Sequence, residues 1–379
     1  MISVGLITYH AAYNFGSMLQ AYATQSVIQK LGYKCEIINY RPLQQQHYYN
    51  DLINVHSGLK PFIRSVFLLK NYKSRNVRAL RYEQFMKEYL SLSEHMYSVP
   101  SQLSEISSYY DIFVSGSDQI INKHSNELES EDWSAMSPYL LSFTNKPKIS
   151  YASSPANMTD FELMKIADEL KKFKYISCRE VASAKKLSEL LGIEVTNVLD
   201  PTLLLDKEYW NNFIKNKKMT LPDNYIVYYS LIGPKPMRKV SAQLAEISRS
   251  TNLPVVMITP FAPVTNEDWS IDASSFGPIE FLYAISHASS VITNSYHGTL
   301  FALNFGVPFW SISQGKGADL RKDQILHALK LDSRIVANLS EISIESLMSP
   351  KLDLSYTLFL RQLREFSVAY LKKALANSI

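Results

Sequence analysis

The stretch that decides the fold is Ser290–Ile312, which reads SVITNSYHGTLFALNFGVPFWSI. Its order predicts a short apolar strand at Val291 and Ile292, a polar turn, a helix and a second apolar strand. The turn therefore lies at the carboxyl end of a strand, which is where open α/β sheets bind ligands. The helix start also offers backbone N–H groups and the positive end of a dipole, and both suit a phosphate or a carboxylate.

Two interpretations of this turn remain open. In the first it is a binding site, because His297 can supply a proton or a positive charge near neutral pH and Gly298 lets the backbone approach a ligand. In the second, Asn294 or Ser295 only caps the helix and His297 points to solvent.

The amino-terminal end of the chain repeats the strand–loop–helix order. Residues 2–8 predict a buried strand, a helix runs from Gly16 to about Leu31, and residues 34–40 form a second strand. This βαβ unit implies a parallel sheet with right-handed crossovers. The loop is not a dinucleotide-binding fingerprint, because Gly-x-Gly-x-x-Gly is absent. Its polar and small residues at this strand end are His10, Asn14, Gly16 and Ser17.

Two more strands end in residues suited to chemistry. Asp118 and Gln119 follow the strand 111–115, and Asp118 can accept a proton from a hydroxyl group or merely cap the next turn. Arg179 follows the strand 175–178, and its guanidinium can bind a carboxylate or a phosphate. The alternative for Arg179 is a surface ion pair with Glu180 or a nearby Asp.

The length of 379 residues favours two domains. Alternating strands and helices predict an α/β fold with two Rossmann-like domains of parallel sheet, divided at Asp200-Pro201 into residues 1–200 and 201–354. Residues 355–379 predict a helix that crosses back to the first domain, with Phe359, Leu363, Phe366 and Tyr370 on one stripe. We further predict one helix over 160–172, irregular structure over 41–110 and a loop over 260–278.

Composition excludes several classes of protein. The net charge of +4 is too small to indicate nucleic acid binding, and 46 % apolar residues describe a globular protein. Cys35 and Cys178 form no Cys-x-x-Cys motif, so we expect neither zinc nor a disulfide. Cys178 precedes Arg179, which can lower a thiol pKa, but a buried strand cysteine is the expected state. No secretion signal and no apolar run of about 18 residues is found, so we expect a cytoplasmic protein.

Residues 52–82 combine seven basic residues with apolar ones and contain no acidic residue. Such a segment can lie on an anionic membrane surface, which would place the protein peripherally at the inner face of the cell membrane. The alternative is a helix with a solvated basic face that packs on the sheet.

Three motifs in order carry a family resemblance: Asn14-Phe-Gly-Ser-Met-Leu-Gln-Ala-Tyr22, Arg179–Ser183 followed by Val198–Leu205, and Asn294–Thr299. Together they resemble the polysaccharide pyruvyltransferase family, over about residues 3 to 315. Members of that family transfer a pyruvyl group from phosphoenolpyruvate to sugar hydroxyls as a ketal. The resemblance implies a glycosyltransferase-B-like architecture with phosphoenolpyruvate between the domains. It implies no cofactor besides this co-substrate, and an acceptor that is a sugar or a lipid-linked precursor of a surface polysaccharide.

The resemblance also implies roles for individual residues. His297 and Asp118 would be catalytic, with His297 as general acid or phosphate partner. The acceptor side would comprise His10, Asn14, Gly16, Ser17 and Gln119. The donor side would comprise Arg179, Asn294, Ser295, Tyr296, Gly298, Thr299 and Lys316. No metal is expected, and the sequence has neither His-x-x-x-His nor Asp-x-Asp.

The sequence departs from the family pattern at Ser295, where some members carry Arg. The missing charge would come from Arg179, Lys316 or Arg321, or the donor would differ. Two other functions therefore stay open. One is a nucleotide-sugar glycosyltransferase of the same shape, in which Glu280 resembles the acidic residue near a ribose. The other is a non-catalytic glycan-binding protein.

Overall fold

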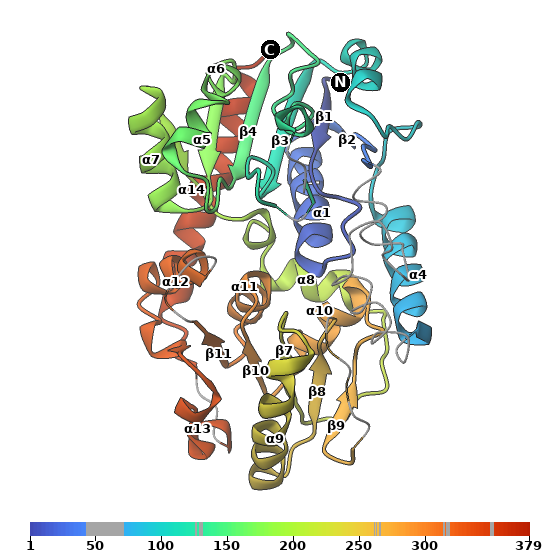
Figure 1. Cartoon of the computed structure of the whole chain (residues 1–379), viewed down its shortest axis with the longest axis vertical. Helices are drawn as coiled ribbons and strands as arrows, with labels where there is room; N and C mark the ends of the chain where they lie inside the picture. Colours follow the sequence, from blue (N-terminus) through green and yellow to red (C-terminus); the bar gives the residue numbers. More distant parts are fainter. Residues whose placement is uncertain are drawn as a thin grey trace. The chain divides into compact units, whose positions relative to one another are not determined.

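The computed structural model describes residues 1–42, 72–125, 127–128, 132–260, 262, 264, 267–313, 315, 319–348 and 352–379. The chain divides into two compact units. Among the described residues, the first unit comprises 1–42, 86–205 and 360–379, and the second comprises 72–85 and 206–359. Each unit contains one six-stranded parallel sheet, which confirms the predicted α/β fold (Figure 1).

The first sheet has the strand order β2-β1-β3-β4-β5-β6. Strand β1, next to the edge strand, pairs with β2 on one side and β3 on the other, so that Leu6 lies opposite both Ile37 and Val114. The chain order reverses between β1 and β3, which makes this gap the topological switch point where open sheets bind ligands. The strands are β1 (Ser3–Ile7), β2 (Lys34–Ile37), β3 (Ile112–Asp118), β4 (Lys148–Ser153), β5 (Tyr175–Cys178) and β6 (Val195–Asn197).

The helix that follows β1, α1 (Phe15–Lys30), is buried from Phe15 to Ile28. The sequence indicated one apolar stripe, whereas the helix contacts β2, β3 and the short helix η4 (Pro201–Leu203) and is therefore covered on more than one side. Polar residues in it, such as Gln20 and Thr24, are consequently buried and bond within the protein.

The predicted single helix over 160–172 is wrong. A capping box between Thr159 and Glu162 starts α5 (Asp160–Met164), but Ile166 adopts φ −111° and ψ 5° and separates it from α6 (Ala167–Leu170). Ile166 is buried in the core, so packing overrides the helical pattern. The other helices of this unit are α7 (Val181–Leu191), η2 (Pro100–Ser108) and η3 (Trp133–Met136).

The second sheet has the strand order β12-β11-β10-β7-β8-β9, and its switch point lies between β7 and β10. The sequence analysis missed β9 inside the expected loop and the two-residue β12. The strands are β7 (Ile226–Tyr229), β8 (Val255–Ile258), β9 (Ser270–Asp272), β10 (Ser290–Thr293), β11 (Phe309–Ile312) and β12 (Ile335–Val336). The helices are α8 (Lys207–Ile214), α9 (Pro234–Thr251), α10 (Pro278–Ser286), α11 (Tyr296–Phe305), α12 (Asp319–Ala328), α13 (Ile344–Met348), η5 (Asp332–Arg334) and η6 (Leu339–Glu341).

The predicted irregular structure over 41–110 is wrong for residues 72–89, which form α4 (Tyr72–Tyr89). The sequence-based division placed this segment in the first domain, but residues 72–85 pack with the second unit. Arg81 explains this, because its side chain pairs with Glu280 at 3.3 Å and donates to Ser275 O at 2.9 Å. The described part of the basic segment is thus a packed helix, and residues 52–71 lie outside the described residues. Across the part of the chain that the structure describes, no helix has both the length and the apolar character to cross a membrane.

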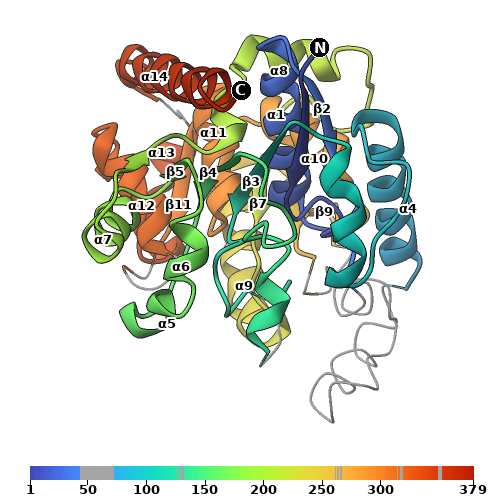
Figure 2. The same ribbon diagram turned by 90° about the horizontal axis from the view of Figure 1, so that it is seen from above.

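The last helix, α14 (Tyr356–Ala376), is seen from above in Figure 2 as one long element. From residue 360 onward it packs on the first unit, where Ser367 Oγ accepts a bond from Leu199 N at 2.9 Å. The predicted inward stripe is displaced, since Phe359 and Phe366 are exposed. The buried positions of α14 instead include Leu360, Ser367, Leu371 and Ala374.

Candidate functional site

In the first unit, polar side chains gather where β1 and β3 end. Asn14 caps α1, with its Oδ1 accepting from Gly16 N at 2.9 Å. This cap sets the first turn so that Ser17 Oγ donates to Asp118 Oδ2 at 2.7 Å. Gln20 fixes the same turn to β3 by accepting from Ser117 N at 3.1 Å. The sequence-predicted residues Asn14, Gly16, Ser17 and Asp118 are thus brought together.

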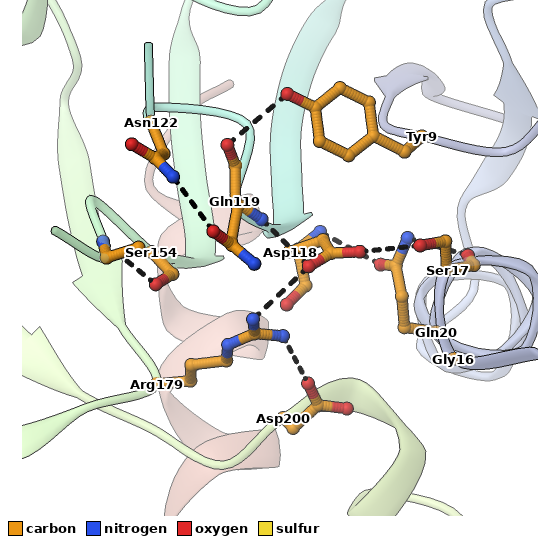
Figure 3. Close-up of polar contacts among 12 residues, drawn as sticks. Tyr9, Gly16, Ser17, Gln20, Asp118, Gln119, Asn122, Ser154, Arg179 and Asp200 are labelled. Atoms are coloured by element: carbon orange, nitrogen blue, oxygen red, sulfur yellow. Dashed lines mark hydrogen bonds and ion pairs between the residues drawn. The ribbon is translucent and has the colours of Figure 1, made fainter. Parts of the chain in front are cut away.

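The backbone at the end of β3 has an uncommon conformation. Gly116 has φ +132°, and a Cβ there would lie 2.0 Å from the backbone oxygen of Tyr151, so only glycine fits. Asp118 has φ 76°, in the left-handed region that non-glycine residues rarely adopt. Residues held in such conformations cluster at functional sites. Figure 3 shows the resulting arrangement, with the Asp118 carboxylate between Ser17 and Arg179.

Arg179 holds three carboxylates. Its Nη2 lies 3.2 Å from Asp118 Oδ1, its Nη1 3.0 Å from Asp200 Oδ2 and its Nε 3.2 Å from Glu180 Oε1. The Arg179 side chain is 1 % exposed and that of Asp118 is 11 % exposed. The alternative of an ion pair with Glu180 or an Asp is therefore realised, but as a buried network instead of a surface pair.

The network carries a formal charge of −2, from three carboxylates and one guanidinium. Carboxylate oxygens accept hydrogen bonds, so this end of the first sheet offers acceptors for hydroxyl groups. Gln119 belongs to the same cluster, since its N donates to Asp118 Oδ1 at 2.9 Å and its Oε1 accepts from Asn122 Nδ2 at 2.8 Å.

Four members of this cluster escaped the sequence analysis: Tyr9, Gln20, Asn122 and Asp200. Tyr9 donates from its hydroxyl to Gln119 O at 3.3 Å. The sequence could have marked Asp200 as a candidate site residue, because a polar residue at the carboxyl end of a parallel strand lies at the edge where ligands bind. The sequence places Asp200 at a domain boundary and inside the motif Val198–Leu205, but its bond to an arginine 21 positions away has no local pattern.

His10 lies in the core, with no exposed surface. Its Nε2 is 3.1 Å from Asn39 Oδ1 and its Nδ1 3.3 Å from Thr8 O. Burial lowers the pKa of His10 to about 4, and the charge of Arg41 acts in the same direction. His10 is therefore uncharged at neutral pH, and its contacts favour a structural role over acceptor binding.

In the second unit, the decisive turn joins β10 to α11. Ser295 is the N-cap of α11, and its Oγ accepts from Gly298 N at 3.3 Å. Asn294 Oδ1 accepts from Leu231 N at 3.0 Å, which links the ends of β10 and β7 across the switch point. Thr299 donates from Oγ1 to Ser295 O at 3.0 Å and lies 3.2 Å from Ser311 Oγ. The capping alternative holds for Ser295, but His297 is 8 % exposed and does not project into solvent.

Gly298 is required by a close approach within the protein. A Cβ there would lie 2.6 Å from Thr293 Oγ1 and 2.7 Å from Tyr229 Cδ1. Burial raises the pKa of Tyr229 to about 12, while its hydrogen bond with Ser295 and the charge of Arg78 act to lower it. The ring of this buried tyrosine from β7 therefore lies directly against the turn at Gly298.

The three candidates for the missing cation have different positions. The Arg321 guanidinium carbon lies 5.9 Å from the centre of the Tyr296 ring, beside the turn. Arg179 belongs to the first unit and bonds to three carboxylates. Lys316 lies outside the described residues. Glu280 is engaged within its own unit, by Gly277 N at 3.0 Å and by Arg81.

Comparisons with known proteins agree with this architecture. A family model described as polysaccharide pyruvyl transferase matches residues 14–315. No curated protein matches the sequence. The solved structures that resemble the chain include UDP-N-acetylglucosamine 2-epimerases, which are of the glycosyltransferase-B type. Because the sequence identity to these proteins is low, the likeness shows a shared fold and nothing about function.

Three of these epimerases cover nearly the whole chain. That of Rickettsia bellii has a TM-score of 0.54 and 8 % identity, covering 100 % of this chain and 96 % of its own. That of Methanocaldococcus jannaschii has a TM-score of 0.54 and 12 % identity, covering 93 % of both chains. That of Neisseria meningitidis has a TM-score of 0.51 and 8 % identity, covering 100 % of both.

Proposed function

The chain belongs to the polysaccharide pyruvyl transferase family, and we propose that it transfers the pyruvyl group of phosphoenolpyruvate to two hydroxyl groups of a sugar unit. The observation that carries this proposal is the β10–α11 turn, which lies inside the matched region and at the switch point of the second sheet. There His297 stands in the first turn of a helix whose start favours anions.

The reaction that we propose balances as follows. The methylene carbon of phosphoenolpyruvate gains a proton, which makes its central carbon electrophilic. Two sugar oxygens form bonds to that carbon, and its bond to the phosphate oxygen breaks. The two hydroxyl protons end on the new methyl group and on the released phosphate, and the product is a cyclic pyruvate ketal.

On the donor side, we assign His297 the transfer of a proton to the methylene carbon or to the departing phosphate. His is suited to this because its charge changes near neutral pH. The start of α11, with Asn294, Ser295, Tyr296, Gly298 and Thr299, would stabilise the negative charge of the donor. For Lys316, which lies outside the described residues, the proposed role in donor binding is based on the sequence alone.

On the acceptor side, we assign Asp118 the acceptance of a hydroxyl proton. Ser17 and Gln119 orient its carboxylate by donating hydrogen bonds to it. Arg179 then acts as a positioning residue for Asp118, which revises the donor clamp expected from the sequence. Asn14 and Gly16 serve by fixing the first turn of α1.

We propose a precursor of a surface polysaccharide, free or lipid-linked, as the acceptor, and an action in the cytoplasm or at the inner face of the membrane. The family supports a polysaccharide acceptor in general. We place the reaction in the cytoplasm because the proposed donor, phosphoenolpyruvate, is an intracellular metabolite.

One observation favours a second candidate, a nucleotide-sugar enzyme. The Methanocaldococcus and Neisseria epimerases were solved with UDP-N-acetylglucosamine, and they share the fold. Against this candidate, the Glu280 carboxylate that would meet a ribose already bonds to Gly277 and Arg81.

Thermal unfolding with each donor separates the two candidates. At a concentration about 100 times its dissociation constant, a ligand stabilises the native state by about 2.7 kcal/mol. We expect phosphoenolpyruvate to raise the unfolding midpoint of the parent protein and to raise that of His297→Ala less. A midpoint raised by UDP or UDP-N-acetylglucosamine, and not by phosphoenolpyruvate, would favour the nucleotide-sugar enzyme.

A further inference from the structure

The last helix, α14, keeps an apolar face outside the core of the first unit. Phe366, which the sequence predicted to point inward, is 54 % exposed, and Ala369 and Lys373 are exposed as well. Tyr370 is half-buried. These four residues follow the spacing i, i+3, i+4 and i+7, so they share one face of the helix.

This face of α14 lines a cavity of about 460 Å³ that lies within the first unit. The edge strand β6 contributes Thr196 to the lining, and Ile193 comes from the segment just before that strand. Phe173 and Ile176 add further apolar side chains. Cavities of a few hundred Å³ with largely apolar walls are of the size that binds small molecules.

Hydrogen bonds fasten the end of α14 to the first sheet beside this cavity. Asn377 Nδ2 donates to the Tyr175 hydroxyl at 2.9 Å, and Lys174 Nζ donates to the backbone oxygen of Asn377. The rings of Tyr175 and Tyr370 meet edge to face, with their centres 6.3 Å apart. Lys174, Tyr175 and Tyr370 all line the cavity, so these contacts hold its walls in place.

The lining of the cavity is positively charged. It includes three lysines and one glutamate, which give a formal charge of +2: Lys171, Lys174, Lys373 and Glu194. Lys171 and Lys373 are exposed, and neither forms an ion pair with another residue that the structure describes. An apolar cavity with ammonium groups in its lining fits a molecule that combines an apolar chain with an anionic group.

We propose that this cavity binds an anionic lipid, whose phosphate pairs with Lys171 and Lys373 and whose acyl chain lies beside Phe366. The bound lipid attaches the first unit to a membrane surface. Lysines combined with apolar side chains are the residue types that bind anionic membranes, because the charges attract the headgroups and the apolar groups leave water.

The cavity is separate from the candidate site in the same unit. Its residues Tyr175 and Glu194 stand at the amino ends of β5 and β6, whereas Asp118 and Arg179 stand at the carboxyl ends of β3 and β5. Since the sheet is parallel, these are opposite edges. The lipid site therefore goes beyond the proposed function and does not depend on it.

The test is sedimentation of the full chain with vesicles of phosphatidylcholine alone or of phosphatidylcholine mixed with phosphatidylglycerol. A double variant, Lys171→Gln with Lys373→Gln, removes two charges from the lining. Ala369→Trp fills the cavity from an exposed helix position and keeps the charges. Lys185→Gln is the matched control, because it removes an exposed lysine of the same unit that does not line the cavity.

We expect the parent to bind the mixed vesicles more tightly than the neutral ones. The double variant should bind the mixed vesicles at least about tenfold more weakly than the parent, since each lysine near an anionic surface contributes about fivefold. Ala369→Trp should bind them several-fold more weakly, and Lys185→Gln should bind them as the parent does.

Equal binding of the parent to both kinds of vesicle would overturn the proposal, and so would parental binding by the double variant. Parental binding by Ala369→Trp would overturn the acyl-chain site, because charge alone would then explain the attachment. A loss in Lys185→Gln as large as that in the double variant would overturn the cavity as the place of contact. Should the double variant fail to fold, Lys373→Gln alone decides in the same way. No arm of this experiment uses phosphoenolpyruvate, so its result is independent of the proposed function.

Discussion

A single guanidinium at residue 179 organises the first site. Replacing Arg179 by Met would leave Asp118, Glu180 and Asp200 buried without their shared cation. Breaking a buried ion pair by removing one partner typically costs about 3–5 kcal/mol, so we expect a loss of that size in the free energy of unfolding. Urea denaturation measures it.

The control for this prediction is Glu180→Gln. The amide oxygen can still accept from Arg179 Nε, and one excess negative charge is removed. We expect a change below about 1 kcal/mol. An Arg179→Met protein as stable as the parent would contradict the account of Arg179 as the residue that positions Asp118.

His10 predicts a pH dependence of stability. Its pKa is about 4 in the folded protein, against about 6.5 in the unfolded chain. Between these values the unfolded state binds the proton, so the free energy of unfolding falls as the pH is lowered from about 6.5 to 4, by up to about 3 kcal/mol. In His10→Gln this contribution is absent. Urea titrations across that pH range should show that the free energy of unfolding depends less steeply on pH in the variant than in the parent. An equal pH dependence in both proteins would contradict the burial of a neutral His10.

The sequence predicts a site residue when its position after a strand or in a polar turn indicates its role. It does not predict contacts with residues that are distant in the sequence. Asp118 and Ser17 were identified because each follows a strand in a polar segment. Arg179 was identified as a cation, but its three carboxylate partners include residues 61 and 21 positions away. His10 stands in the same loop as Asn14, yet it is buried against Asn39, and no local pattern distinguishes a buried polar side chain from an exposed one.

At the scale of elements, the approach of α4 to α10 depends on a glycine. A Cβ at Gly277 would lie 2.6 Å from Arg81 Cβ, and the conformation of Gly277 itself is accessible to alanine. Gly277→Ala therefore tests packing together with a small N-cap contribution, because Gly277 is the N-cap of α10. We expect a loss of about 1–3 kcal/mol in the free energy of unfolding, as for other overpacked positions.

Gly233 offers the matched comparison, since it is also an N-cap glycine and a Cβ there would meet nothing within 4 Å. We expect Gly233→Ala to cost less than about 1 kcal/mol. Thermal denaturation of both variants decides the point, and equal losses would show that α4 does not need the close contact at Gly277.

Elements with a strong period were predicted, and those shaped by tertiary packing were not. The strands and helices around β10 and α11 were expected from apolar runs and a polar turn. The break at Ile166 and the short strands β9 and β12 have too few residues to show a period. A packed helix was one of the two interpretations of residues 52–82, but its contacts with Ser275 and Glu280 have no local pattern in the sequence.

At the scale of the whole molecule, the alternation of strands and helices predicts two parallel sheets, and both are present. Each sheet reverses its strand order once, and each candidate site lies at that reversal, as the general rule for such sheets requires. The assignment of residues 72–85 to the second unit could not be predicted, because it depends on an ion pair between residues 81 and 280.

The chemistry of transfer is tested most directly by carbon-13 NMR of phosphoenolpyruvate labelled at its methylene carbon. The parent protein is incubated with this donor and with glycan precursors extracted from the source organism. The His297→Ala variant is incubated in the same way as the control. The account predicts that the labelled carbon becomes a ketal methyl group attached to glycan, with release of one phosphate for each ketal, and that His297→Ala forms far less of it. Labelled phosphoenolpyruvate that stays unchanged, while an added UDP-sugar is consumed, would contradict the account.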